Sequence, residues 1–208
     1  AGLGGMGAAG VGVALVRGAP RPVDGVALLG VHRSDHVVAL VELDAAGGGR
    51  LDPDTTMGPG SWQAARLAAG AGLVAIDGLR NGDAEVAFCA VRPPGHHATP
   101  TRTMGFCLLN NVAVAAASLA DAGERVAIID IDAHHGNGTQ DAFVADGRVL
   151  FVSCHQWPLY PGTGAVDEVG TGDGLGTTIN VPLPTGAAGD TYRYAMDVVL
   201  VPAVVRVA

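Results

Sequence analysis

The sequence of 208 residues contains no lysine. Its twelve positive side chains are all arginine, and twenty Asp and Glu residues bring the formal net charge to −8. A protein that grips nucleic acid through phosphates needs a basic patch or stripe that releases counterions, and the sequence has none. We therefore expect no nucleic-acid partner.

Cysteine is scarce as well. Cys89, Cys107 and Cys154 are the only three, an odd number without CxxC spacing. This pattern supports neither a disulfide framework nor a thiolate zinc site. It fits a reducing compartment, so we expect a cytoplasmic protein.

Long apolar runs are also missing. No run reaches the roughly 18 residues of a membrane span, and no basic region precedes an apolar core near the N-terminus. We expect no membrane contact. The chain begins at Ala1 without methionine and ends at Ala208 in a helix-like run. We therefore expect a fragment.

What the sequence does contain is enough for one domain, with 49% hydrophobic residues. We expect a single partial domain over 1–208, with 1–25 as a low-complexity or truncated lead-in. Gly2, Gly4 and Gly7 have the GxGxxG spacing of a dinucleotide-binding loop, but that motif is meaningful only after a strand, and no strand precedes it.

From Glu85 onward, short apolar runs alternate with polar or glycine-rich loops. Buried strands are predicted at EVAFCAV (85–91), RVAIIDI (125–131) and RVLFVSC (148–154). Helices are predicted from Ser61, as the cap, to about Gly78, and over the run NVAVAAASLADAG (111–123), which Gly123 would end. Such alternation is typical of a parallel sheet with helices on its faces, where ligands bind beyond the carboxyl ends of strands.

The stretch IDIDAHHGNGTQ (129–140) places two carboxylates and two imidazoles at such an end. In an extended strand Asp130, Asp132 and His134 project to one side. A carboxylate and an imidazole two residues apart can bind one zinc ion, and four ionisable groups after an apolar run would be costly without a cation or other partners. We predict a metal site at Asp132 and His134.

A second cluster, RPPGHHA, places His96 and His97 in a loop stiffened by two prolines. Imidazole titrates nearest to neutral pH of all side chains. A rigid histidine pair beside a metal site therefore predicts general acid and base catalysis.

Four motifs together, RPPGHHA, GFCLLNNVAVAA, IDIDAHHGNGTQ and PLYPGTGA, resemble the zinc-dependent histone deacetylase family, especially its bacterial and class II-like members. The resemblance runs from about Val31 to the end. It implies a three-layer α/β fold of the arginase/deacetylase type, with a mainly parallel sheet that is incomplete at the C-terminus. It also implies zinc-dependent hydrolysis of an N-acetyl amide of the acetyllysine or acetylpolyamine type. The expected partner is therefore an acetylated amine or an acetylated protein.

By this resemblance Asp132 and His134 are two of three zinc ligands, and the third ligand and a catalytic tyrosine would lie beyond Ala208. His96 and His97 match the paired catalytic histidines. Asp130 is then the partner of His96 and favours its charged form, whereas the neutral amide of Asn137 leaves His97 competent as a base.

The same resemblance implies a substrate tunnel lined by Gly105, Phe106 and Tyr160, with Asp54 as a rim residue that grips the substrate backbone. A structural potassium ion is also implied. Its ligands would be Ser153 and backbone carbonyls near Asp130, Asp132 and His134.

Two alternatives remain open at this point: a ureohydrolase-like metalloenzyme with two metal ions, and a ligand-binding descendant without catalysis. Four other histidines are interpreted as packing, surface or locally bonded residues: His32, His36, His135 and His155.

Overall fold

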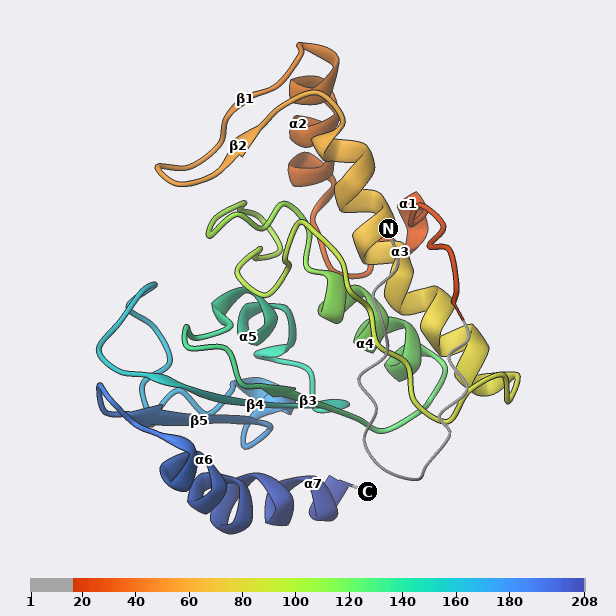
Figure 1. Cartoon of the computed structure of the whole chain (residues 1–208). Helices are drawn as coiled ribbons and strands as arrows, with labels where there is room; N and C mark the ends of the chain where they lie inside the picture. The colour runs from red at the N-terminus through yellow and green to blue at the C-terminus, as the bar shows by residue number, and fades with distance from the viewer. Residues whose placement is uncertain (1–16, 208) are drawn as a thin grey trace, which may run out of the picture.

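The structure, a computed structural model, describes residues 17–207 (Figure 1). The glycine motif at Gly2, Gly4 and Gly7 lies outside the described residues. Within them, no helix is both long enough and apolar enough to cross a membrane.

A three-stranded parallel sheet lies at the centre of the fold, in the order β3 (Val126–Asp130), β4 (Val149–Gln156) and β5 (Thr178–Leu183). The first two are the predicted strands. We did not predict β5 from the sequence. It is an edge strand in the described part of the chain, which is where its Pro182 can be tolerated.

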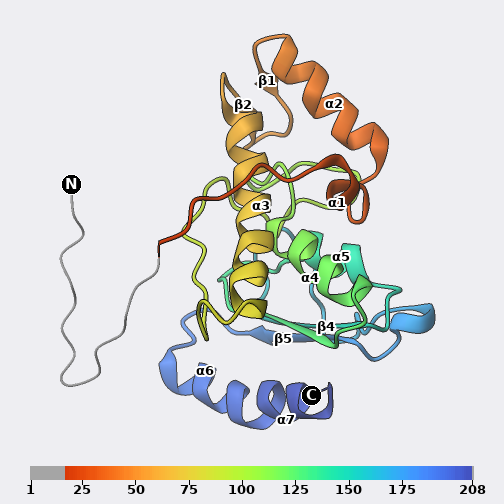
Figure 2. The same cartoon turned by 90° about the vertical axis from the view of Figure 1, so that its right-hand side faces the viewer.

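Alternate side chains of β4 enter two separate cores. Val149 and Phe151 pack with α4 (Asn111–Asp121) and with Phe143 of α5 (Asn137–Phe143) on one face. Leu150 and Val152 face the opposite layer. That layer consists of α6 (Gly189–Ala195), a π-helical turn (Met196–Leu200) and α7 (Val201–Val207). Figures 1 and 2 show the sheet between these helices. The predicted three-layer α/β arrangement is therefore present.

Further helices stand over the α4 side of the sheet. They are α1 (Gly25–Leu29), α2 (Ser34–Ala45) and the long α3 (Ser61–Arg80), which packs on α4. Beside α2, β1 (Gly49–Arg50) and β2 (Thr56–Met57) form an antiparallel hairpin. A short 3₁₀ turn at Gly172–Gly174 precedes β5. The predicted cap at Ser61 was wrong. Gly60 is the N-cap residue of α3, and the Ser61 hydroxyl accepts a hydrogen bond from the Gly58 amide.

The predicted strand over 85–91 was also wrong. The segment has no strand pairing, and Val86 and Phe88 are more than four-fifths exposed. An apolar composition favours a strand only where a neighbouring strand offers backbone partners, and the described residues offer none here.

Part of the predicted lead-in is ordered against α3. The Val23 amide donates to the Arg66 carbonyl, the Arg66 guanidinium donates to the Val23 carbonyl, and the Val23 side chain is buried. Gly70 makes this approach possible, since a Cβ there would overlap the Arg21 carbonyl oxygen.

Candidate functional site

The predicted site residues gather beyond the carboxyl end of β3. Asp130 ends that strand, and its Oδ2 lies 2.9 Å from the His96 Nδ1. Gly136 passes so close that a Cβ would lie 2.2 Å from the same carboxylate oxygen. The loop carrying His96 and the loop after β3 are therefore packed directly together.

Burial disfavours a charge on His96, but the hydrogen bond that His96 donates to Asp130 and the negative charges of Asp130 and Asp132 outweigh this effect and raise the pKa of His96. His96 is thus biased toward the imidazolium form.

His97 has a different environment. It is buried, and its Nδ1 donates to the Oδ1 of Asn137, the first residue of α5, at 2.8 Å. The amide of Asn137 is oriented by its nitrogen, which donates to the Met104 sulfur. Burial lowers the pKa of His97, and the neighbouring His96 lowers it further, although the bond to Asn137 acts in the opposite direction. His97 is thus biased toward the neutral form, with Nε2 as its free acceptor.

Asp132 and His134 lie in the loop after β3, about half exposed, with the His134 Nδ1 3.1 Å from the Asp132 Oδ1. Two ligands of a tetrahedral zinc ion stand about 3.3 Å apart, so these two donors fit one divalent cation. Across residues 17–207 no group of three His, Cys, Asp or Glu side chains is arranged to hold a metal. The described residues therefore supply two donors of such a site.

Tyr160 brings a third segment, the loop after β4, to the same place. Its ring is edge-on to His97 at 5.1 Å and to His134 at 5.9 Å between centroids. Burial, with the negative charges of Asp54 and Asp52, raises the pKa of Tyr160 to about 12, so the phenol stays protonated.

Gly105 and Phe106 border this cluster from another side. A Cβ on Gly105 would lie 2.3 Å from the His97 ring, so only glycine fits. Phe106 is more than half exposed. The hairpin residue Asp54 accepts a hydrogen bond from the Gly105 amide, which places the predicted rim residue beside the predicted tunnel wall.

Ser153 lies next to Asp130 in the parallel register of β3 and β4. It is fully buried, and its hydroxyl lies 3.0 Å from the His155 Nδ1, while the His155 Nε2 donates to the Gly164 carbonyl. His155 is therefore bonded locally, as expected.

The sequence did not reveal a polar network behind the site. His135 contacts the Thr163 hydroxyl and the Gln140 side-chain oxygen, and Gln140 donates to Glu168 at 2.6 Å. The other Glu168 oxygen accepts from the backbone amides of Gly164 and Ala165. The network joins the loop with the predicted metal donors to the loop that carries Tyr160. The only signal in the sequence was the glutamine that ends GNGTQ.

His32 and His36 are both buried, so the interpretation as packing residues fits and the surface alternative does not. His32 donates through Nδ1 to the Thr99 carbonyl and accepts through Nε2 from the Asn110 amide. It thereby ties the turn between α1 and α2 to the loop after His97 and to Asn110, the N-cap residue of α4.

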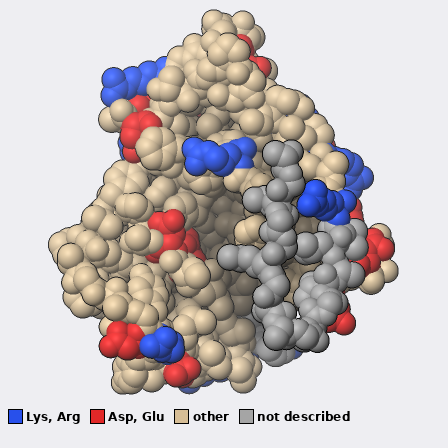
Figure 3. Space-filling model, in the orientation of Figure 1, with Lys and Arg blue, Asp and Glu red and all other residues tan. Residues whose placement is uncertain are grey.

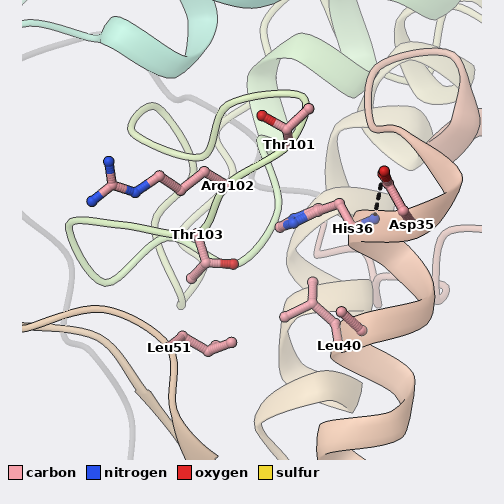
Figure 4. Close-up of a pocket in the computed structure, with 8 residues that line it drawn as sticks. Asp35, His36, Leu40, Leu51, Thr101, Arg102 and Thr103 are labelled. Atoms are coloured by element: carbon pink, nitrogen blue, oxygen red, sulfur yellow. Dashed lines mark hydrogen bonds between the residues drawn. The ribbon is translucent and has the colours of Figure 1, made fainter.

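The charged side chains on the face drawn in Figure 3 are scattered and form no basic stripe. A cavity of about 320 Å³ lies between α2 and residues 101–103, and none of the predicted site residues line it (Figure 4). The catalytic candidates therefore do not line this cavity.

The chain is similar in sequence to known deacetylases. Residues 8–207 match the histone deacetylase domain. A probable deacetylase of Archaeoglobus fulgidus is 47% identical over 85% of this chain and 49% of its own length. A histone deacetylase-like amidohydrolase of Pseudomonas aeruginosa is 42% identical over 92% of this chain and 51% of its own. The chain thus spans about half the length of these relatives.

Two solved structures are similar throughout most of the chain. The HDA15 HD domain has a TM-score of 0.86 and a sequence identity of 41%, and the match covers 90% of this chain and 55% of that one. An acetylpolyamine aminohydrolase from Burkholderia pseudomallei has a TM-score of 0.83 and a sequence identity of 30%, and the match covers 90% of this chain and 64% of that one. The predicted fold class is confirmed.

Proposed function

Because this chain belongs to the histone deacetylase family, we propose that the complete protein is a zinc-dependent deacetylase that hydrolyses an N-acetyl amide to acetate and a free amine. The observation that carries the proposal is the convergence of His97, His134 and Tyr160, from three separate segments, within about 6 Å of one another.

Asp132 and His134 would hold the zinc ion, together with a ligand outside the described residues. When bound, zinc lowers the pKa of water and polarises the acetyl carbonyl. Hydrogen bonds from the His134 amide and ring, together with nearby positive charge, outweigh burial and lower the pKa of Asp132. Its carboxylate is therefore charged and ready to bind a cation at neutral pH.

His97 is the general base in this proposal. Its Nδ1 hydrogen is fixed by Asn137, so Nε2 is free to take a proton from the attacking water and return it to the leaving amine. His96, charged through its contact with Asp130, supplies positive charge to the site. The two adjacent imidazoles thus have different roles because their partners differ in charge.

The substrate would present its acetyl group on an alkyl stem between Phe106 and Tyr160, as acetyllysine and acetylpolyamines do. Tyr160 adds a polar hydroxyl to this wall. The net charge of −8 mildly favours cationic substrates, and salt would weaken this effect. We further propose that Ser153 and the carbonyls near Asp130, Asp132 and His134 hold a structural potassium ion.

The test is acetate release by the complete protein from an acetyllysine peptide and from acetylspermidine in parallel. Asp132→Ala should abolish release and zinc binding, whereas Asp173→Ala, an exposed aspartate in a surface turn, should retain both. Metal-dependent release lost only in Asp132→Ala supports the proposal. No release from either substrate by protein carrying its full complement of zinc would overturn it.

A further inference from the structure

We propose that Thr55 is a positioning residue that, together with Asp54, holds Phe106 in the conformation that forms the tunnel wall. This inference deepens the proposed function and rests on it for its effect on catalysis. It begins from an unusual turn rather than from the metal donors.

Met104 to Cys107 form a tight turn closed by a hydrogen bond from the Cys107 amide to the Met104 carbonyl. Both central residues have positive φ, 57° at Gly105 and 63° at Phe106, as in a type I′ turn. Phe106 is the one non-glycine residue with positive φ among residues 17–207. Bulky side chains rarely adopt this conformation, so other contacts must hold it.

The hairpin between β1 and β2 supplies these contacts. The Phe106 amide donates to the Thr55 hydroxyl at 2.9 Å, and the Gly105 amide donates to the Asp54 Oδ1 at 3.2 Å. The Thr55 hydroxyl in turn donates to that same Oδ1 at 2.7 Å. One hydroxyl and one carboxylate oxygen therefore bind both central amides of the turn.

On its other side the turn packs against the site, where a Cβ on Gly105 would overlap the His97 ring, but the segment before the turn is less constrained. Residues 101–103, which lead into the turn, line the cavity of about 320 Å³ shown in Figure 4. The Thr103 hydroxyl points into it, buried and without a hydrogen-bond partner. The segment that leads into the turn therefore borders open space, which gives it room to shift once the amides of Gly105 and Phe106 lose their partners.

Thr55 itself is 1% exposed and cannot reach a substrate. Its effect on the reaction must therefore pass through Phe106, whose ring is exposed at the site. Asp54 is exposed and is also the residue expected to contact the substrate at the rim, whereas Thr55 has only the positioning role. Thr55 is for this reason the better residue to test.

The experiment compares Thr55→Val and Thr55→Ser in the complete protein. Valine has nearly the same shape but lacks the hydroxyl, whereas serine keeps it. Acetate release is measured for N-acetylbutylamine, which has an alkyl stem, and for N-acetylmethylamine, which has none. For Thr55→Val we expect KM for the butyl substrate to rise about tenfold with little change in kcat, and no change for the methyl substrate. Thr55→Ser should resemble the wild type.

A second readout does not depend on activity. Amide hydrogen exchange over residues 104–107 should become faster in Thr55→Val but not in Thr55→Ser. Equal losses of kcat for both substrates with KM unchanged, or unchanged exchange, would overturn the positioning role. If the wild type releases no acetate, the proposed function fails, and the exchange result alone decides whether Thr55 holds the turn.

Discussion

The Nδ1 of His97 donates to the side-chain oxygen of Asn137 at 2.8 Å, and this neutral partner separates His97 from the adjacent His96, which faces a carboxylate. An amide oxygen fixes the position of the ring hydrogen without adding charge. The neutral state of His97 therefore depends on residue 137 being an amide.

Replacing that amide by a carboxylate tests this dependence. In Asn137→Asp the new negative charge should raise the pKa of His97, because an opposite charge at hydrogen-bonding distance favours the imidazolium. The unprotonated base would then be available only at higher pH. We expect the acidic limb of the profile of kcat/KM against pH to move upward by about one to two pH units.

The matched control is Asp167→Asn, an exposed carboxylate on the loop after β4. Its profile should coincide with that of the wild type. An unmoved acidic limb in Asn137→Asp, in protein that retains its zinc, would remove His97 from the role of base.

Glu168 should matter for stability because it belongs to the polar network behind the site. It accepts hydrogen bonds from Gln140 and from two backbone amides, and these bonds outweigh burial and lower its pKa. In Glu168→Gln the new amide nitrogen would face either the Gln140 nitrogen or the backbone amides of Gly164 and Ala165, so donors would oppose each other in both orientations. We expect the free energy of unfolding to fall by about 1–3 kcal/mol, measured by urea denaturation.

Asp167→Asn, one residue away, should change the free energy of unfolding by less than about 0.5 kcal/mol. Equal stability of the Glu168→Gln and Asp167→Asn variants would show that the network behind the site contributes nothing measurable.

The buried His32 should make stability depend on pH. Burial and the neighbouring His36 lower the pKa of His32 to about 4, from 6.5. As pH falls, His32 takes up a proton at a higher pH in the unfolded chain than in the folded one. The contribution of the neutral, buried His32 to stability is therefore fully present above pH 6.5 and is lost as pH falls toward 4. This gap corresponds to about 3 kcal/mol.

Urea unfolding of the wild type and of His32→Asn between pH 7 and pH 4.5 measures this contribution. The variant should be less stable at pH 7, because the bonds to Thr99 and Asn110 are weakened. Its stability should also decline less steeply with falling pH. Parallel curves for the two proteins would exclude His32 as a source of the pH dependence.

Residues 1–208 by themselves should bind zinc weakly and release little acetate. Asp132 and His134 are two donors, catalytic zinc sites normally have three protein ligands, and no group of three is found in the described part of the chain. Equilibrium dialysis of this chain against zinc measures the affinity. Tight binding of one ion per chain would contradict the expectation.

The local sequence determined much of the site. The pairs His96–His97 and Asp132–His134 are close together because they are adjacent or two residues apart in the chain. Apolar runs followed by polar loops predicted β3 and β4, with the site residues just beyond the end of β3. These features depend on neighbours within a few residues, so periodicity and composition reveal them. The same reasoning failed at 85–91, because a strand also needs a partner that composition does not specify.

Only the tertiary structure decided which distant groups meet. That His97 faces Asn137, that Glu168 braces the loop of Tyr160, and that Thr55 binds the Phe106 amide are contacts between segments separated by 28 to 51 positions along the chain. Such contacts depend on how strands and helices stack, since hydrogen bonds form only where folding brings a donor within about 3 Å of an acceptor. The reactive groups could be identified from the sequence, whereas their partners, and through them their charge states, depend on the packing of the folded chain.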